Sequence, residues 1–187
     1  MSSSNRFDSR FSAFKIAYSG VICALTILIM FAGVIPALTY IMPAIAGILI
    51  WSVSIQINPK WGLLSYISVT VLSLILVPEI ESKTFFIMLF GYYPLLRGCI
   101  HRVGFRPVRF MFKLALFNVT AVISYSIVVY VFGVSDVLDG LEFFGEKAVY
   151  AFWGLGNVAF FLYDFSLSYV CYAFEHWVKP VVNRKIK

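Results

Sequence analysis

The sequence predicts an all-α, polytopic membrane protein in which one domain, residues 1–187, forms a single bundle of six transmembrane helices. Hydrophobic residues make up 61% of the chain and charged residues 13%, whereas soluble domains average about 45–50% and about 25%. A hydrocarbon core about 30 Å thick requires about 20 apolar residues per helix. Six such helices with short loops nearly use up the 187 residues, so we expect no separate soluble domain among them.

The charged residues change sign from one gap between apolar stretches to the next. Thirteen of the fifteen lysines and arginines lie in four patches, which are Arg6/Arg10/Lys15, Lys60, Arg97/Arg102/Arg106/Arg109/Lys113 and Lys179/Arg184/Lys185/Lys187. Six of the nine acids lie in the two alternate gaps, namely Glu79/Glu81 and Asp136/Asp139/Glu142/Glu146. Because short loops rich in lysine and arginine stay in the cytoplasm, both termini are predicted to be cytoplasmic. Anionic lipid headgroups account for the basic charge, so the predicted partner is membrane lipid and not nucleic acid.

The first three helices are predicted at residues 13–35, 39–57 and 61–77. Pro36 opens the outer loop between the first two helices. The segment Asn58-Pro59-Lys60 is typical of a tight turn, because proline fixes φ and asparagine favours turn initiation. This turn carries a lysine and is therefore expected on the cytoplasmic side.

The last three helices are predicted at residues 84–100, 108–132 and 147–177. Pro94 is expected to kink the fourth helix and to free a backbone carbonyl around Phe90. The basic stretch between the fourth and fifth helices forms the main cytoplasmic loop, and the acidic stretch before the sixth forms the long outer loop. A membrane β-barrel is excluded because the apolar runs are continuous and do not alternate.

Catalytic and metal-binding signatures are absent from the sequence. We find no P-loop, dinucleotide-binding, zinc-protease or serine-hydrolase motif. His101 and His176 fall at cytoplasmic helix ends, and Cys23, Cys99 and Cys171 lie in or beside apolar segments on different helices. We therefore expect no enzyme, no cofactor, no metal site and no disulfide.

Asp164 is the one acidic residue predicted near the middle of the membrane. A charge at that depth needs a partner, and such residues usually have a role, so Asp164 is either functional or part of a structural ion pair. Counted from the outer helix ends at 1.5 Å per residue, Arg97 lies roughly 20 Å deep and Asp164 roughly 25 Å deep. We predict that these two side chains form a buried ion pair.

Three further patterns mark candidate surfaces. Trp153, Asn157 and Asp164 share one face of the sixth helix, which suits a cavity wall, although a membrane asparagine also serves to join helices. The segment Gly91-Tyr92-Tyr93-Pro94 either presents a tyrosine hydroxyl inward or simply kinks the helix. A small-residue face on the first helix packs against this chain's own helices or against a separate subunit; it consists of Ala13, Ala17, Gly20 and Ala24.

Together, the chain length, the six predicted spans, the small-residue face, the Gly91-Tyr92-Tyr93-Pro94 segment and the Tyr163-Asp164 pair resemble the substrate-binding S components of energy-coupling factor transporters. The likeness covers most of the chain and is nearest to a poorly characterised branch from Gram-positive bacteria. It implies a multi-pass protein of the bacterial cytoplasmic membrane that captures a vitamin-like micronutrient from the outer face. The protein would then dock on a transmembrane T subunit that carries two ATPases.

The resemblance also assigns residues. The small-residue face of the first helix would meet the T subunit, and the outer halves of the last three helices would hold the ligand. The matching binding residues are Tyr92, Tyr150, Trp153 and Asn157. No ligand signature for thiamine, riboflavin, folate, biotin or cobalt is present, so the ligand stays open. The acidic outer loop favours a cationic or neutral one.

The alternative function is that of a non-transporting membrane scaffold of the rod-shape-determining MreD type, which has a similar size and helix number. Its loops would recruit protein partners, and the basic stretch from Arg97 to Lys113 would suit that purpose. A pocket facing outward distinguishes the two functions, because a transport subunit needs one and a scaffold can be packed solid.

Overall fold

The computed structural model describes residues 3–100, 104–133, 148–174 and 176, and every regular element within these residues is a helix. Three stretches, Ser12–Val34, Pro59–Leu76 and Arg106–Val131, are long and apolar enough to cross a membrane. The predicted all-helical class therefore holds for the described residues. The acidic outer loop and the C-terminal basic patch lie outside them.

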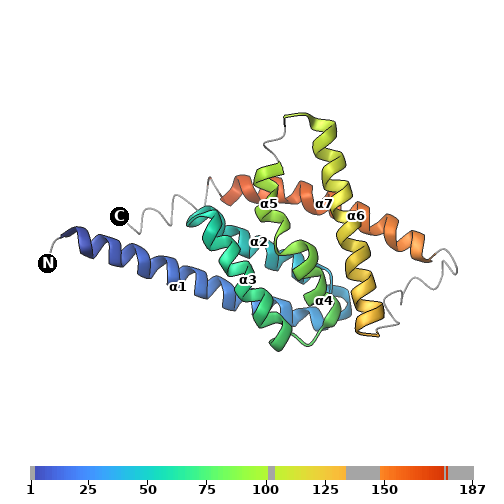
Figure 1. Cartoon of the computed structure of the whole chain (residues 1–187), viewed down its shortest axis with the longest axis horizontal. Helices are drawn as coiled ribbons and strands as arrows, with labels where there is room; N and C mark the ends of the chain where they lie inside the picture. The colour runs from blue at the N-terminus through green and yellow to red at the C-terminus, as the bar shows by residue number, and fades with distance from the viewer. Residues whose placement is uncertain (1–2, 101–103, 134–147, 175, 177–187) are drawn as a thin grey trace.

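The first three helices form one packed unit (Figure 1). They are α1 (Ser3–Phe31), α2 (Ile41–Gln56) and α3 (Pro59–Leu76). α1 begins ten residues before the predicted start and is followed by two short 3₁₀ turns, η1 (Ala32–Val34) and η2 (Pro36–Leu38). Between α2 and α3, the Asn58 side chain accepts a hydrogen bond of 2.9 Å from the Trp61 amide, and Pro59 occupies the first helical position. This cap explains why the turn ends one helix and begins the next.

The core of this unit is made of aliphatic side chains from all three helices. Met30, Ile50 and Val69 have no exposed surface. Phe86, which also has none, reaches this cluster from the segment after α3. The opposite faces of α1 and α3 are apolar as well but remain uncovered by protein: Val21 is 67% exposed and Ile75 77% exposed.

The predicted fourth helix is broken into three parts instead of being kinked once. α4 (Ile80–Phe85) leads into η3 (Phe86–Phe90), a π-helical turn in which the Gly91 amide donates to the Phe86 carbonyl at 2.8 Å. α5 (Tyr93–Ile100) then starts immediately before Pro94. Proline has no amide hydrogen to give to the carbonyl four residues earlier, so the chain changes helical register before it.

The freed carbonyl belongs to Phe90, and α2 approaches it closely. A Cβ atom placed on Gly47 would overlap the Phe90 carbonyl oxygen. Glycine is therefore required at this position for α2 to pack against the break. Gly91 has a similar constraint from the Tyr66 ring, whose Cε2 would lie 2.6 Å from an added Cβ.

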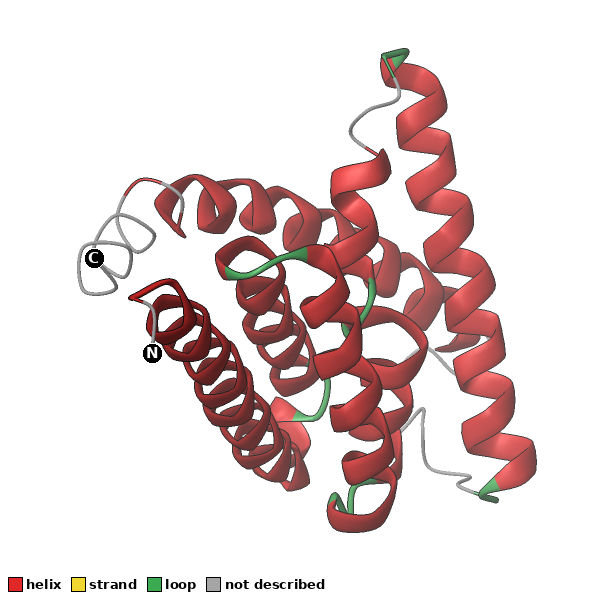
Figure 2. Cartoon of the chain, turned by 60° about the vertical axis from the view of Figure 1, so that its left-hand side comes forward, coloured by secondary structure: helices red, strands yellow, loops and turns green. Residues whose placement is uncertain are grey.

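The remaining helices are α6 (Arg106–Ser126), which continues into the π-helical η4 (Ile127–Val131), and α7 (Ala148–Ala173). Figures 1 and 2 show α7 crossing α5 and α6 instead of running beside them along its whole length. At the crossing, the Phe117 and Phe160 rings stack with centroids 4.7 Å apart. Beyond it, the two helices diverge, and the space between them is used differently at its two ends.

Candidate functional site

On one side of the crossing, a cavity of about 480 Å³ opens between the start of α2, the α4–η3 segment, α6 and α7. This volume falls within the range of small-molecule sites, about 300–1,000 Å³. The lining residues are Tyr40, Ile41, Ala44, Phe85, Leu89, Phe90, Phe117, Ala121, Phe152, Trp153, Leu155, Gly156, Ala159, Phe160 and Tyr163.

The lining is aromatic and almost free of polar groups. Eight of these residues carry aromatic rings, and none carries a charge. Two of the polar atoms are already engaged, because Tyr40 donates to a Glu81 carboxylate oxygen at 2.7 Å and Tyr163 to the Ala44 carbonyl at 3.4 Å. The cavity is therefore suited to holding an apolar molecule, and nothing in its lining could activate a nucleophile.

Glu81 lies beside the cavity in the segment predicted to face outside. Burial raises its pKa above the ordinary value, the hydrogen bond from Tyr40 lowers it, and the neighbouring charge of Glu79 raises it, with a net upward shift. The Tyr40–Glu81 bond ties the start of α2 to α4 at the rim of the cavity.

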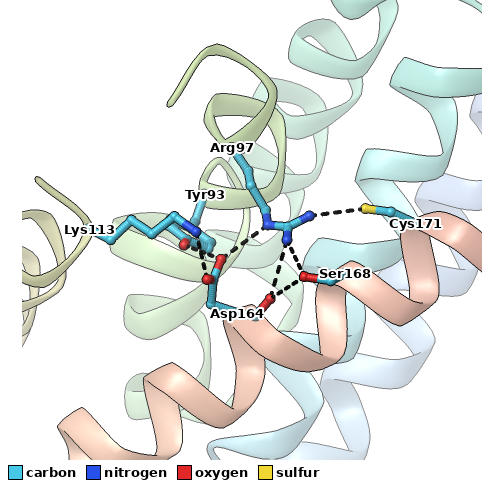
Figure 3. Close-up of polar contacts among 6 residues, drawn as sticks. All are labelled: Tyr93, Arg97, Lys113, Asp164, Ser168 and Cys171. Atoms are coloured by element: carbon cyan, nitrogen blue, oxygen red, sulfur yellow. Dashed lines mark hydrogen bonds and ion pairs between the residues drawn. The ribbon is translucent and has the colours of Figure 1, made fainter. Parts of the chain in front are cut away.

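On the other side of the crossing lies a polar cluster centred on Asp164 (Figure 3). Its Oδ1 atom accepts hydrogen bonds from the Tyr93 hydroxyl at 2.7 Å and from Arg97 Nε at 3.0 Å. Its Oδ2 atom accepts from Lys113 Nζ at 2.6 Å. The side chains of Arg97, Asp164 and Lys113 are only 10%, 17% and 7% exposed. The structure thus places the predicted partners Arg97 and Asp164 in direct contact.

Helical spacing explains how three elements supply this cluster. Tyr93 and Arg97 are four residues apart on α5, so both side chains leave the same face. On α7, Arg97 reaches beyond Asp164 to the hydroxyl of Ser168 at 2.5 Å and to the sulfur of Cys171 at 3.3 Å. The guanidinium group therefore spans two turns of α7 and fixes the position of α5 on it.

A pair of amides joins α6 to α7 next to Phe117 and Gly156 in the sequence. Asn118 Nδ2 donates to Asn157 Oδ1 at 3.0 Å, and Asn157 Nδ2 donates to Asn118 Oδ1 at 3.3 Å. Asn157 also donates to the Trp153 carbonyl of its own helix at 2.9 Å. Its amide is thus engaged in joining the two helices, the second of the roles considered for it.

The four residues predicted to bind ligand are not brought together in the structure. Trp153 lines the cavity. Asn157 pairs with Asn118, and Tyr92 packs edge-on against Tyr66 with centroids 6.2 Å apart, outside the cavity lining. Tyr150 is 79% exposed. Half of the eight aromatic rings that line the cavity come from α7, and the other half come from Tyr40 before α2, the α4–η3 segment and α6. Helical spacing within α7 could not have indicated this second half.

The predicted docking face of α1 is open in the structure. Ala13, Ala17, Gly20 and Ala24 are all exposed, and an added Cβ at Gly20 would meet no atom within 4 Å. The buried face of α1 carries Ser19, Thr26 and Met30 instead. The small-residue face is therefore not used for packing against the described part of this chain.

Sequence reasoning missed Lys113 and Tyr93 as partners of Asp164. The charge pattern groups Lys113 with the basic cytoplasmic loop, yet it lies inside the predicted fifth helix, five residues after its start. A lysine within an apolar span is itself a signal for a buried acidic partner. Tyr93 could have been found from its spacing of four residues to Arg97.

The chain matches no family model, no curated protein and no solved structure. The cavity, the cluster and the exposed apolar faces are therefore the features that bear on function. Among the described residues, no group of three or more histidine, cysteine, aspartate or glutamate side chains could hold a metal ion.

Proposed function

We propose that this protein is the substrate-capture subunit of a membrane transporter for a small micronutrient, similar to the S components of energy-coupling factor transporters. The observation that carries the proposal is the cavity of about 480 Å³ at the ends of α2, α4 and α7 that are predicted to face outside. A scaffold of the MreD type has no need for such a cavity. The lining contains no group for catalysis, which favours binding over chemistry.

The exposed surface supports a membrane location. α1, α3 and α6 leave large apolar side chains uncovered, such as Leu28 at 66%, Ile75 at 77% and Met111 at 68% exposed. Contiguous apolar surface of this kind marks membrane or protein contacts. We propose six membrane crossings, with both termini in the cytoplasm of a bacterial cell, because of the alternating charge pattern.

Cysteine labelling of intact cells tests this topology. In a cysteine-free background, a membrane-impermeant maleimide should label Pro78→Cys from outside and should label Phe105→Cys only after the cells are opened. Both positions are exposed. Ser82, in the same acidic segment, is fully buried and unsuitable as a probe site. Labelling of Phe105→Cys in intact cells would contradict the proposed orientation.

The transport partner is tested by purification from the native host. Capture predicts that a transmembrane subunit and two ATPases co-purify, together with a small molecule detected by mass spectrometry. The exposed small-residue face of α1 is the proposed contact. Gly20→Leu should therefore insert normally but lose the partner subunits, whereas unchanged co-purification would remove α1 from the interface. Recovery of cell-shape or division proteins without any transport subunit would favour the scaffold function instead.

A further inference from the structure

The chemistry of the cavity restricts its ligand more narrowly than the charge of the outer loop does. We propose that the cavity takes an uncharged, ring-containing apolar molecule, and that charged ligands, including the cationic ones favoured by the acidic loop, are rejected. This inference rests on the proposed capture function and specifies its substrate class.

The cavity lining supplies no counter-charge for a charged ligand. None of the lining residues is ionisable at neutral pH. Two acids lie next to lining residues without being part of the lining, and both already accept hydrogen bonds: Glu81 from Tyr40 at 2.7 Å, and Asp164 from Lys113 at 2.6 Å. A charged group in the cavity would lose its water without gaining a partner, which is strongly unfavourable.

Cation–π attraction is the one way in which such an aromatic lining could hold a positive charge. The desolvation cost of an unpaired ammonium group exceeds the attraction that a few rings supply. Asp164, which follows the lining residue Tyr163, is paired with both Arg97 and Lys113, so this cluster has one net positive charge and would repel a cation. The balance therefore favours a neutral ligand.

The rings of the lining are arranged so that they can contact a flat aromatic ligand. Phe117 and Phe160 stack with their planes 18° apart at the cavity wall, and Phe90 and Tyr163 meet edge-on at 87°. Aromatic pairs prefer offset-stacked or edge-on contacts. A flat ring entering this lining can form both kinds of contact, whereas a flexible chain can form neither.

Two glycines of α7 allow the cavity to be filled by a substitution that has a matched control. Gly156 lines the cavity, and a Cβ there would lie 3.4 Å from the Phe117 ring, which is ordinary contact. Gly154, two residues earlier on α7, is exposed, and a Cβ there would meet no atom within 4 Å. Gly156→Leu fills the cavity, and Gly154→Leu places the same side chain outside it.

The experiment measures binding of N-phenylnaphthylamine, an uncharged aromatic dye, by its fluorescence in the purified full-length protein. Wild type and Gly154→Leu should show saturable binding above the micelle background. Gly156→Leu should bind the dye at least about tenfold more weakly than wild type, because the added side chain occupies the site. Naphthalenemethanol should displace the dye. Its anionic and cationic counterparts are naphthalenesulfonate and naphthylmethyl-trimethylammonium. Each should compete with the dye at least about tenfold more weakly than naphthalenemethanol does.

Equal competition by either charged counterpart would overturn the proposed substrate class, as would a lack of saturable dye binding in wild type. Equal binding by Gly156→Leu and wild type would show that the dye binds elsewhere, and would also overturn the proposal. These results leave the capture function to be judged separately by co-purification. A charged small molecule recovered with transport subunits would keep the function and contradict the substrate class. Selective dye binding by a protein that co-purifies with no transport subunit would support the substrate class and contradict the capture function.

Discussion

The space between α6 and α7 is filled by side chains on one side of their crossing and is left open as a cavity on the other. Helices that cross diverge on both sides of the contact, here the stacked Phe117 and Phe160 rings. On one side, the long side chain of Lys113 bridges the gap from α6 to Asp164 on α7, and Arg97 reaches the same carboxylate from α5. On the other side, the wall includes small residues such as Ala159, and the gap remains as the cavity.

This difference indicates that the cluster side stabilises the fold and that the cavity side is available for binding. A buried carboxylate with three donors tolerates little change, because loss of one partner leaves a charge uncompensated. An apolar cavity places no such demand on its lining. We therefore expect substitutions on the cluster side to affect stability, and substitutions on the cavity side to affect ligand binding.

The largest effect is expected at the centre of the cluster. Asp164→Asn removes the carboxylate that Arg97 and Lys113 share and should lower the free energy of unfolding by about 3–5 kcal/mol. Adding Arg97→Gln or Lys113→Gln should recover part of the loss, since each removes one of the two charges that this carboxylate balanced. The measurement is unfolding in detergent micelles for the single and double variants. If each double variant loses as much as the sum of its singles, the charges are not coupled.

The next largest effect is expected where α2 meets the helix break. Gly47→Ala places a Cβ against the Phe90 carbonyl oxygen and should destabilise the protein by about 1–3 kcal/mol through overpacking. Gly20→Ala is the matched control, because that position is open, and it should stabilise α1 by up to about 1 kcal/mol through helix propensity. Thermal unfolding of both variants compares them directly. Equal stability of the two would contradict the close contact.

A smaller effect is expected at the amide pair that joins α6 to α7. Asn157→Ala removes the bonds to Asn118 and should cost about 0.6 kcal/mol, the average for polar contacts between membrane helices. The double variant with Asn118→Ala should cost less than the sum of the two single changes. A loss as large as that of Asp164→Asn would contradict the greater importance of the charge cluster in holding α7.

Much of the fold and part of the site could be predicted from sequence. The contact of Arg97 with Asp164 follows from depth along two helices and from the cost of an unpaired charge. Pro94 indicated a disturbed helix but not the form of the disturbance, because a missing amide hydrogen is compatible with a simple kink as well as with a π-helical turn. The cavity was beyond prediction by residue pattern, since its lining comes from several elements and its size depends on how α7 crosses α6.

The smallest effect is expected at the rim of the cavity, outside the membrane-spanning segments. The pKa of Glu81 is raised above its ordinary value of 4.5 in the folded protein, mainly by burial. The folded state then binds more protons than the unfolded state, so this residue's contribution to stability falls as the pH rises past that value. Relative to Glu81→Gln, wild type should lose stability between acidic and neutral pH. Parallel melting curves across that range would exclude the shift.

The most direct test of the cavity as a binding site is native mass spectrometry of the protein released from membranes of its own host. Wild type and Gly154→Leu should each carry an additional small mass that dissociates on activation. Gly156→Leu should carry none, although it is as stable as the Gly154→Leu control. The same bound mass on all three proteins, or on none of them, would contradict the assignment of this cavity as the capture site.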